Sequence, residues 1–322
     1  MHRETRIFVA GHRGLVGSAI YRKLQNRGYS NLIVANRQEL DLLNTEAVEH
    51  FYTKYRPEVV FVAAAKVGGI YANSTYCADF IHENLIIQNN VIWGAHRSGV
   101  RRLIFLGSSC IYPRNSKQPI SEDELLNGTL EYTNRSYAVA KIAGMELVHS
   151  LRRQFGADYF SLMPTNLYGP NDNYDPMNSH VIPGIIHKIS LAKHAGLSQV
   201  TLWGSGRPRR EFMFSLDCAD AIVYLAENLT PDFFDQDRYP YKGFSHINIG
   251  VGVDFTIEEV ANIIKDALGY TGEIVFDAAF PDGVDRKLLD ISVLKNLGWT
   301  PQTDLQTGIG IAIDWFESSG LK

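Results

Sequence analysis

Cysteine is scarce in this 322-residue sequence, which contains only Cys77, Cys110 and Cys218. An odd number of widely spaced cysteines argues against a disulfide framework, and their spacing is not that of a paired zinc motif. We therefore expect no metal site, and cysteines that stay reduced, as they do in the cytoplasm. Cys77 and Cys218 lie in no recognisable catalytic motif, and we expect both to be packing residues.

Long hydrophobic runs are also missing. The run "VVFVAAA" at 59–65 is typical of the longest, whereas a helix that spans a bilayer needs about 20 predominantly apolar residues. The first residues, "MHRETRIFVAGHRG", lack the apolar segment of a signal peptide. We therefore expect neither a membrane partner nor secretion.

An excess of positive charge is the third absence. The chain has 31 Lys and Arg against 35 Asp and Glu, for a net charge of −4. The densest basic stretch is "RPRR" at 207–210, which suits one anionic ligand better than a nucleic-acid backbone. We expect a small-molecule ligand and no nucleic acid.

The sequence does contain a regular alternation of two kinds of segment. Apolar runs such as "RIFVA", "NLIVA" and "RLIFLG" alternate with amphipathic stretches such as "SYAVAKIAGMELVHSLRRQFG". The runs are continuously apolar, as expected for parallel strands that are buried on both faces. The pattern predicts an α/β fold with a doubly wound parallel sheet of the Rossmann type.

The alternation loosens after about residue 170. Residues 171–184 are loop-rich, and later elements are shorter, although Thr256 and Glu259 form a capping-box pattern before a helix that Gly269 can end. We expect a cofactor-binding domain at 1–170. A smaller mixed α/β substrate lobe follows at 171–322, with some of its segments returning to the first domain.

Three glycines separate the first expected strand from the first expected helix. Gly11, Gly14 and Gly17 have the spacing that permits a tight turn, close approach of the backbone to a pyrophosphate, and close helix packing. The helix start then offers free N–H groups to the phosphates. This context predicts a dinucleotide site rather than a glycine-rich turn without a ligand.

The end of the second expected strand bears on the choice of cofactor. An NAD site usually has a carboxylate there for the ribose, but this strand ends in Ala35, Asn36 and Arg37. Arg37 and Arg13 can instead hold a 2′-phosphate, which favours NADP(H). Two alternatives stay open: both arginines are solvated surface residues, or Glu39 serves a ribose.

Tyr137 and Lys141 lie four residues apart on an expected helix, so they face the same way. A lysine cation, together with the positive nicotinamide ring of an oxidised cofactor, favours the phenolate, and we expect the two to lower the pKa of Tyr137. Ser108 follows the fourth expected strand, where parallel sheets present catalytic groups. Together with the glycine loop, these residues predict carbonyl reduction.

The chain resembles the extended short-chain dehydrogenase/reductase family in "AGHRGLVGSAI", "AAAKVGGI", "LGSSCIYP", "YAVAKIAG", "PTNLYGPND", "NSHVIP", "WGSG" and "DGVDRKLLD". The resemblance runs from about residue 6 to 316. It implies an NADPH-dependent 3,5-epimerisation and 4-reduction of GDP-4-keto-6-deoxy-D-mannose to GDP-L-fucose. It also implies a homodimer formed through long helices near 78–98 and 137–153. The cofactor contacts that it implies are Gly11, Arg13, Gly14, Leu15, Val16, Gly17, Arg37, Ala64, Leu106, Gly107, Lys141, Pro164, Asn166, Leu167 and His180.

The same resemblance makes Cys110 and His180 the proton-handling pair of the epimerisation, beside Ser108, Tyr137 and Lys141. A ketone at C4 acidifies the hydrogens at C3 and C5, and inversion needs one group that removes a proton and one that returns it. Thiol and imidazole exchange protons near neutral pH. Without this context, Cys110 would be interpreted as a core residue and His180 as a loop histidine.

Five residues would contact the nucleotide sugar by this resemblance, namely Lys188, Trp203, Arg210, Asp282 and Lys287. The family has arginine where this chain has Lys188, and lysine lacks the planar fork of arginine. Two other functions stay open. One is reduction or 4-epimerisation of another nucleotide-linked sugar, and the other is a non-catalytic NADP-sensing regulator on the same fold.

Overall fold

A computed structural model describes residues 1–175, 178–236, 239–241, 243–280 and 282–320. The expected loop at 171–184 is partly outside this range, at residues 176 and 177. Within the described residues, no helix has both the length and the apolarity needed to cross a bilayer.

The larger sheet has six strands in the order β2-β1-β3-β4-β5-β9, and every neighbouring pair is parallel. Its strands are β1 (Ile7–Ala10), β2 (Leu32–Ile33), β3 (Val59–Val62), β4 (Arg102–Leu106), β5 (Asp158–Pro164) and β9 (His246–Ile249). The residues of β1 and β3 are all buried, which explains their continuously apolar sequences. Strand β9 is buried as well, although it contains the polar residues His246 and Asn248. The predicted doubly wound parallel sheet is confirmed.

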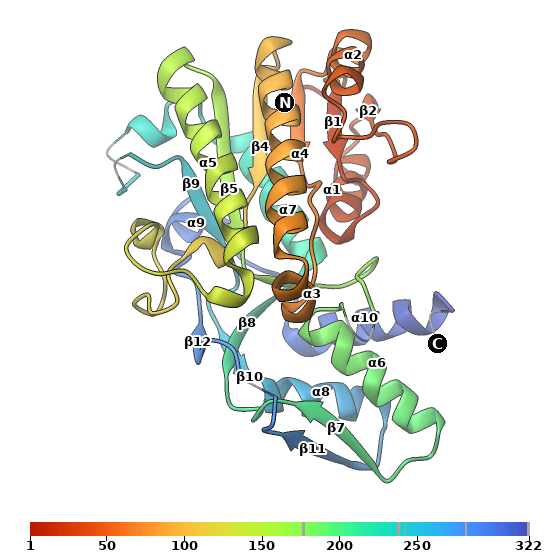
Figure 1. Ribbon diagram of the computed structural model, residues 1–322. Coiled ribbons are helices and arrows are strands. Elements are labelled where there is room, and N and C mark those ends of the chain that lie inside the picture. Colours follow the sequence, from red (N-terminus) through yellow and green to blue (C-terminus); the bar gives the residue numbers. More distant parts are fainter. Residues whose placement is uncertain (176–177, 237–238, 242, 281, 321–322) are drawn as a thin grey trace.

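Helices cover both faces of this sheet (Figure 1). On one face α4 packs against α2 and α5, and on the other α1 packs against α7. Strand order changes direction between β1 and β3, and ligands bind at such a switch point in open α/β sheets. These helices are α1 (Leu15–Asn26), α2 (Thr45–Tyr55), α4 (Cys77–Arg97), α5 (Arg135–Phe155) and α7 (Ser215–Asn228), with α3 (Ile70–Thr75) before α4.

A second lobe lies below the large sheet in Figure 1 and has its own hydrophobic core. Its central strand β8 (Arg209–Phe214) pairs with β6 (Asn166–Tyr168), β10 (Asp254–Thr256) and β12 (Arg286–Lys287), and β7 (Gln199–Trp203) pairs with β11 (Glu273–Asp277). Its helices are α6 (Val181–His194), α8 (Ile257–Leu268) and α10 (Leu305–Ser318), whereas α9 (Ser292–Asn296) packs on β9 of the large sheet. The short 3₁₀ helices of the described residues, in both parts of the molecule, are η1 (Ser109–Ile111), η2 (Glu122–Glu124), η3 (Tyr132–Asn134) and η4 (Phe233–Asp235).

The predicted start and end of α8 are confirmed. Thr256 Oγ1 accepts from the Glu259 N–H at 3.0 Å, and Glu259 Oε2 accepts from the Thr256 N–H at 2.6 Å, which completes the capping box. Gly269 ends the helix with a left-handed φ of 63°.

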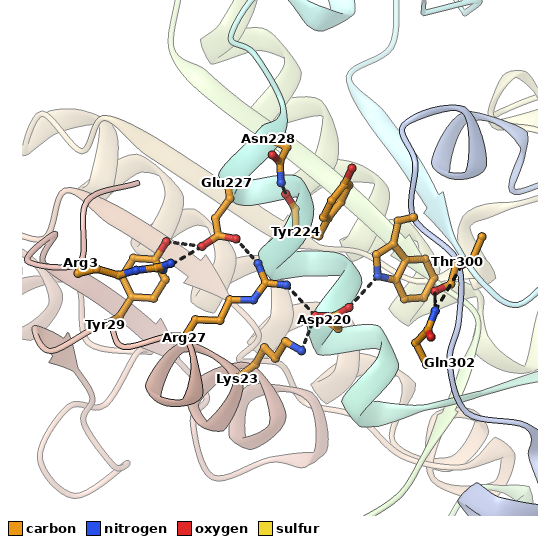
Figure 2. Close-up of polar contacts among 11 residues, drawn as sticks. Arg3, Lys23, Arg27, Tyr29, Asp220, Tyr224, Glu227, Asn228, Thr300 and Gln302 are labelled. Carbon is orange, nitrogen blue, oxygen red and sulfur yellow. Dashed lines mark hydrogen bonds and ion pairs between the residues drawn. The ribbon is translucent and has the colours of Figure 1, made fainter.

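Helix α7 returns from the second lobe to cover the first sheet, and an ionic network holds it on α1 (Figure 2). Asp220 accepts from Lys23 Nζ at 2.5 Å and from Arg27 at 2.9 Å. Glu227 pairs with Arg27 and accepts from the Tyr29 hydroxyl at 2.6 Å. The chain therefore crosses between the two lobes more than once.

Candidate functional site

The first and third glycines of the phosphate loop are required by packing. Gly11 has a φ of +87°, and a Cβ there would lie 2.7 Å from the backbone nitrogen of Ala64 on the neighbouring strand end. A Cβ on Gly17 would lie 2.1 Å from the carbonyl oxygen of Gly11. A side chain at Gly17 would separate α1 from the end of β1, and one at Gly11 would push the loop away from the end of β3.

Gly14 has a different role, because a Cβ there would meet only the Gly11 carbonyl oxygen, at 3.6 Å. Gly14 is the N-cap of α1, and no side chain among the described residues caps the first turn. The N–H groups of Leu15, Val16 and Gly17 thus begin the helix at its positive end, where an anion is stabilised. This cradle fits the pyrophosphate of a dinucleotide.

Two arginines and one glutamate lie near the end of β2. Arg13 and Arg37 are exposed, and neither forms an ion pair within the part of the chain that the structure describes. Glu39 Oε2 accepts from the backbone N–H of Asn36 at 2.8 Å, so this carboxylate closes the turn after the strand. The side chains present fit a 2′-phosphate better than a free ribose hydroxyl.

Ser108, Cys110 and Lys141 meet at the carboxyl end of β4. Ser108 precedes η1, and its Oγ accepts from the backbone N–H of Cys110 at 3.3 Å. Lys141 is 3% exposed and donates from Nζ to the carbonyl oxygen of Leu106 at 2.7 Å. A Cβ on Gly107 would lie 2.3 Å from Met163 Sδ, so the strand end packs closely on β5. Tyr137 is one turn before Lys141 on α5, and Lys141 Nζ lies 5.7 Å from the centre of its ring.

Burial sets the ionisation of this cluster. It raises the pKa of the Cys110 thiol, while the Lys287 ammonium and the Ser108 hydroxyl oppose that rise. Burial also lowers the pKa of Lys141 to about 8. The pKa of Tyr137 is raised, first by burial and then by Cys110. In the protein alone, the phenol form of Tyr137 is therefore favoured, and the expected lowering of its pKa by Lys141 together with an oxidised nicotinamide stays a prediction.

His180 begins α6 as its N-cap residue. His180 is accessible to solvent at the surface of the protein. The protein atoms around its imidazole nevertheless remove part of its hydration, and this desolvation lowers the imidazole pKa. The preceding backbone is fixed by a hydrogen bond from the Gly69 N–H to the Asn178 carbonyl oxygen, at 3.0 Å. Among the described residues, no hydrogen bond joins His180 to Cys110 or Tyr137.

The remaining expected cofactor contacts lie on adjacent strand ends. Pro164 ends β5 and pairs in register with Ile249 of β9. Asn166 and Leu167 belong to β6, and the Asn166 side chain donates from Nδ2 to the Glu211 carbonyl oxygen at 2.9 Å. Ala64 follows β3 beside the glycine loop.

The five expected nucleotide-sugar contacts lie on the second lobe. Lys188 Nζ is 4.3 Å from the centre of the Trp203 ring, which stacks on Phe280 with ring centres 4.6 Å apart. Arg210 and Lys287 are register partners on the parallel strands β8 and β12. Asp282 Oδ1 accepts from the Ser205 N–H at 2.9 Å and Oδ2 from the Ser205 hydroxyl at 2.6 Å, so its carboxylate holds the Gly204–Gly206 turn.

Sequence reasoning missed two side chains near this region. Phe280 stacks on Trp203, and Glu131 lies close enough for its charge to raise the pKa of Lys287 and Arg210, although burial lowers both. Each residue precedes a recognisable motif in the sequence and lies outside it. No sequence pattern therefore marked either residue as part of the site.

The two cysteines expected to be packing residues differ. Cys218 is fully buried in α7, which confirms that expectation, whereas Cys77 is exposed at the start of α4, so that expectation is wrong for it. The amphipathic pattern of α4 does not bury its first residue.

Comparisons with known proteins agree with this geometry. The NAD dependent epimerase/dehydratase family matches residues 7–239. A GDP-L-fucose synthase of Escherichia coli (strain K12) is 50% identical over 313 residues, which are 97% of this chain and 97% of that protein. A GDP-6-OMe-4-keto-L-xylo-heptose reductase from C. jejuni has a TM-score of 0.93 at 37% identity, covering 99% of each chain. A GDP-mannoheptose C4 reductase from Campylobacter jejuni with NADP bound has a TM-score of 0.89 at 39% identity, covering 98% of this chain and 99% of that one.

Proposed function

Because the chain belongs to the NAD dependent epimerase/dehydratase family, we propose that it converts GDP-4-keto-6-deoxy-D-mannose to GDP-L-fucose by 3,5-epimerisation and 4-reduction with NADP(H) as cofactor. The observation that carries the proposal is the buried cluster at the end of β4, where Cys110 lies beside Tyr137 and Lys141. A reductase needs the tyrosine and the lysine, whereas a thiol beside them supplies a second proton-transfer group.

Cys110 removes the protons from C3 and C5 in this proposal, and His180 returns them to the opposite face. The Lys287 ammonium and the Ser108 hydroxyl both favour the thiolate form of Cys110. His180 contributes a lowered imidazole pKa, which makes its protonated form a stronger acid. Ser108 and Tyr137 donate hydrogen bonds to the enolate oxygen at C4.

Tyr137 supplies the proton for the reduction. When bound, NADPH supplies the hydride that is added to C4. Tyr137 is protonated before the reaction because burial raises its pKa, and Lys141 provides a positive charge beside the phenolate that remains. Lys141 also keeps the end of β4 in place through the Leu106 carbonyl.

The cofactor is held by the residues around the switch point of the large sheet. The first turn of α1 binds the pyrophosphate, while Arg13 and Arg37 bind the 2′-phosphate. Support comes from the uncapped start of α1 and from the engagement of Glu39 with Asn36. Ala64, Gly107 and Pro164 line the same strand ends.

The second lobe holds the GDP group in this proposal. Arg210 and Lys287 neutralise the diphosphate, and Trp203 with Lys188 contacts the nucleoside. Asp282 contributes by fixing the turn that follows Trp203.

We also propose a cytoplasmic homodimer. Cys110 must remain a free thiol to act as a base, which suits a reducing compartment.

Helices α4 and α5 lie side by side (Figure 1) and expose Leu85, Trp93, Val139 and Phe155. A second copy would cover these side chains. Light scattering on wild-type protein and on Trp93→Glu should give a dimer and a monomer respectively, and a monomeric wild type would contradict the dimer.

One incubation in deuterium oxide tests the function. Purified protein, NADPH and GDP-4-keto-6-deoxy-D-mannose are mixed, and the product is analysed by mass spectrometry and NMR. We expect GDP-L-fucose with deuterium at C3 and C5. A 4-reduced product without this label would support the second candidate, a plain GDP-sugar C4 reductase like the two C. jejuni proteins. Absence of turnover would contradict the proposed reaction and favour another nucleotide-linked sugar as the substrate.

A further inference from the structure

Glu211 is a fully buried carboxylate in the middle of β8, with 0% of its surface exposed. Its Oε1 accepts from the backbone N–H groups of Val251 and Gly252, at 2.6 and 2.7 Å. Its Oε2 accepts from the backbone N–H of Leu289 at 3.0 Å. One side chain thus joins β8 to two segments that are far from it in the sequence, one after β9 and one after β12.

The segments that Glu211 joins carry different parts of the proposed site. Val251 follows β9, the edge strand of the large sheet, and Leu289 is two residues beyond Lys287. Arg210 immediately precedes Glu211 on the same strand. The carboxylate therefore connects the strand of Arg210 and the segment of Lys287 to the sheet that ends in the cofactor site.

The segment at 286–290 also forms hydrogen bonds with residues 118–120, which lie in the stretch that follows Cys110. The Leu288 N–H donates to Gln118 Oε1 at 2.8 Å, and the Ile120 N–H donates to the Leu288 carbonyl oxygen at 2.8 Å. Asp290 N–H completes this short ladder by donating to the Ile120 carbonyl oxygen at 2.8 Å. A displacement of this segment would move Lys287 relative to Cys110.

Backbone N–H donors surround both oxygens of the Glu211 carboxylate. Burial raises the pKa of the Glu211 carboxyl, and the three backbone N–H groups oppose that rise. A Cβ on Gly250 would lie 2.4 Å from Oε1, so the backbone closes tightly around the carboxylate. Glutamine fits the same space, but its amide nitrogen would face at least one backbone donor.

We propose that Glu211 is a positioning residue, which holds Arg210 and Lys287 in register with the catalytic edge of the large sheet so that the substrate's nucleoside diphosphate is bound with its sugar at Cys110. This role rests on the proposed function. Glu211 itself touches neither substrate nor cofactor, because its carboxylate is occupied by Val251, Gly252 and Leu289.

The experiment compares Glu211→Gln with wild type and with Asp217→Asn. Asp217 is a matched control: it is a buried carboxylate whose Oδ2 accepts from the Gln302 and Thr303 N–H groups at 2.9 and 2.7 Å, but it joins α7 to the segment before α10. The dissociation constants for GDP and for NADPH are measured separately by calorimetry on each protein. We expect Glu211→Gln to weaken GDP binding at least tenfold and to change NADPH binding less than twofold, and Asp217→Asn to leave both within twofold.

Equal losses of GDP and NADPH binding in Glu211→Gln, or no loss of either, would overturn the positioning role. Glu211→Asp keeps the charge with a shorter reach and should recover part of the GDP affinity, so it tests the proposal even if the glutamine variant fails to fold. Amide hydrogen exchange on the same proteins should be faster at 250–252 and 286–290 in Glu211→Gln alone. Wild-type protein that binds no GDP would contradict the proposed function, whereas unchanged amide exchange in Glu211→Gln would contradict the role of Glu211.

Discussion

Cys110 lies where two opposing effects act on one thiol. Burial disfavours its thiolate, and the Lys287 ammonium and the Ser108 hydroxyl favour it. A structural cysteine needs only the burial, as at Cys218, where the pKa is raised by burial and further by Asp217. The cations near Cys110 therefore distinguish a cysteine that can take part in the reaction from one that only packs in the core.

Replacing Cys110 by serine should slow deuterium exchange at C3 and C5 at least 100-fold, because a hydroxyl is a far weaker base than a thiolate. Binding of NADPH should change less than twofold. Product labelling in deuterium oxide and a fluorescence titration with NADPH measure the two quantities. Wild-type exchange rates in the variant would show that Cys110 is a packing residue and not a base.

Replacing Tyr137 by phenylalanine should reduce NADPH oxidation by about 10²- to 10⁴-fold, since general acids contribute rate factors of that order. Exchange at C3 and C5 should persist, because Cys110 and His180 remain. Absorbance of NADPH and product labelling are followed together. Unchanged NADPH consumption would contradict the role of Tyr137.

At this scale the sequence predicted residues whose partners are close in the chain. Gly11, Gly14 and Gly17 were predicted because their spacing, between an expected strand and an expected helix, encodes the turn. Glu211 was not predicted, because its partners at Val251 and Leu289 are brought to it only by the fold.

At the scale of helices and strands, the contact between α1 and the end of β1 restricts which residues the sequence can have there. The start of this helix is held so close to the loop that the Gly17 position admits no side chain. The long helices and the capping box of α8 were predictable from periodicity and caps. The strand β12 has two residues, Arg286 and Lys287, and depends on pairing with β8, so periodicity carried no information about it.

Replacing Gly17 by alanine should weaken NADPH binding at least tenfold and lower the free energy of unfolding by about 1 to 3 kcal/mol. The added methyl group would lie 2.1 Å from a backbone oxygen, which cannot rotate away. Gly310→Ala in α10 is the control, because a Cβ there meets nothing within 4 Å. It should leave NADPH binding unchanged and stabilise the helix by up to about 1 kcal/mol. Similar NADPH affinities in the two variants would contradict the packing role of Gly17.

Stability of the whole molecule depends on pH through Glu122, which is 1% exposed. Its Oε1 accepts from the Asn248 N–H at 3.0 Å, and its Oε2 has no hydrogen-bond partner within the described part of the chain. Burial raises the pKa of Glu122 to about 7. Because the folded state holds this proton more tightly than the unfolded state, the resulting stability is complete below about pH 4.5 and is lost as the pH rises through 7.

Glu122→Gln should therefore raise the free energy of unfolding at pH 8 relative to wild type by up to about 3 kcal/mol more than it does at pH 4.5. Urea unfolding at both pH values measures this difference. Glu317→Gln, at an exposed position on α10, should show no such difference. A wild-type-like pH profile for Glu122→Gln would contradict the assignment.

The path of the chain between the lobes has a consequence for recombination between relatives. Helix α7 and strand β9 follow residue 170 in the sequence, but they complete the large sheet through Asp220, Glu227 and the pairing of β9 with β5. A single crossover near residue 170 would therefore exchange part of the sheet together with the substrate lobe. A chimera that transfers specificity should take residues 215–249 from the same parent as the first half of the chain, and exchange the pieces on either side of 215–249 separately. The reason is that residues that are neighbours in the gene are not neighbours in the fold here.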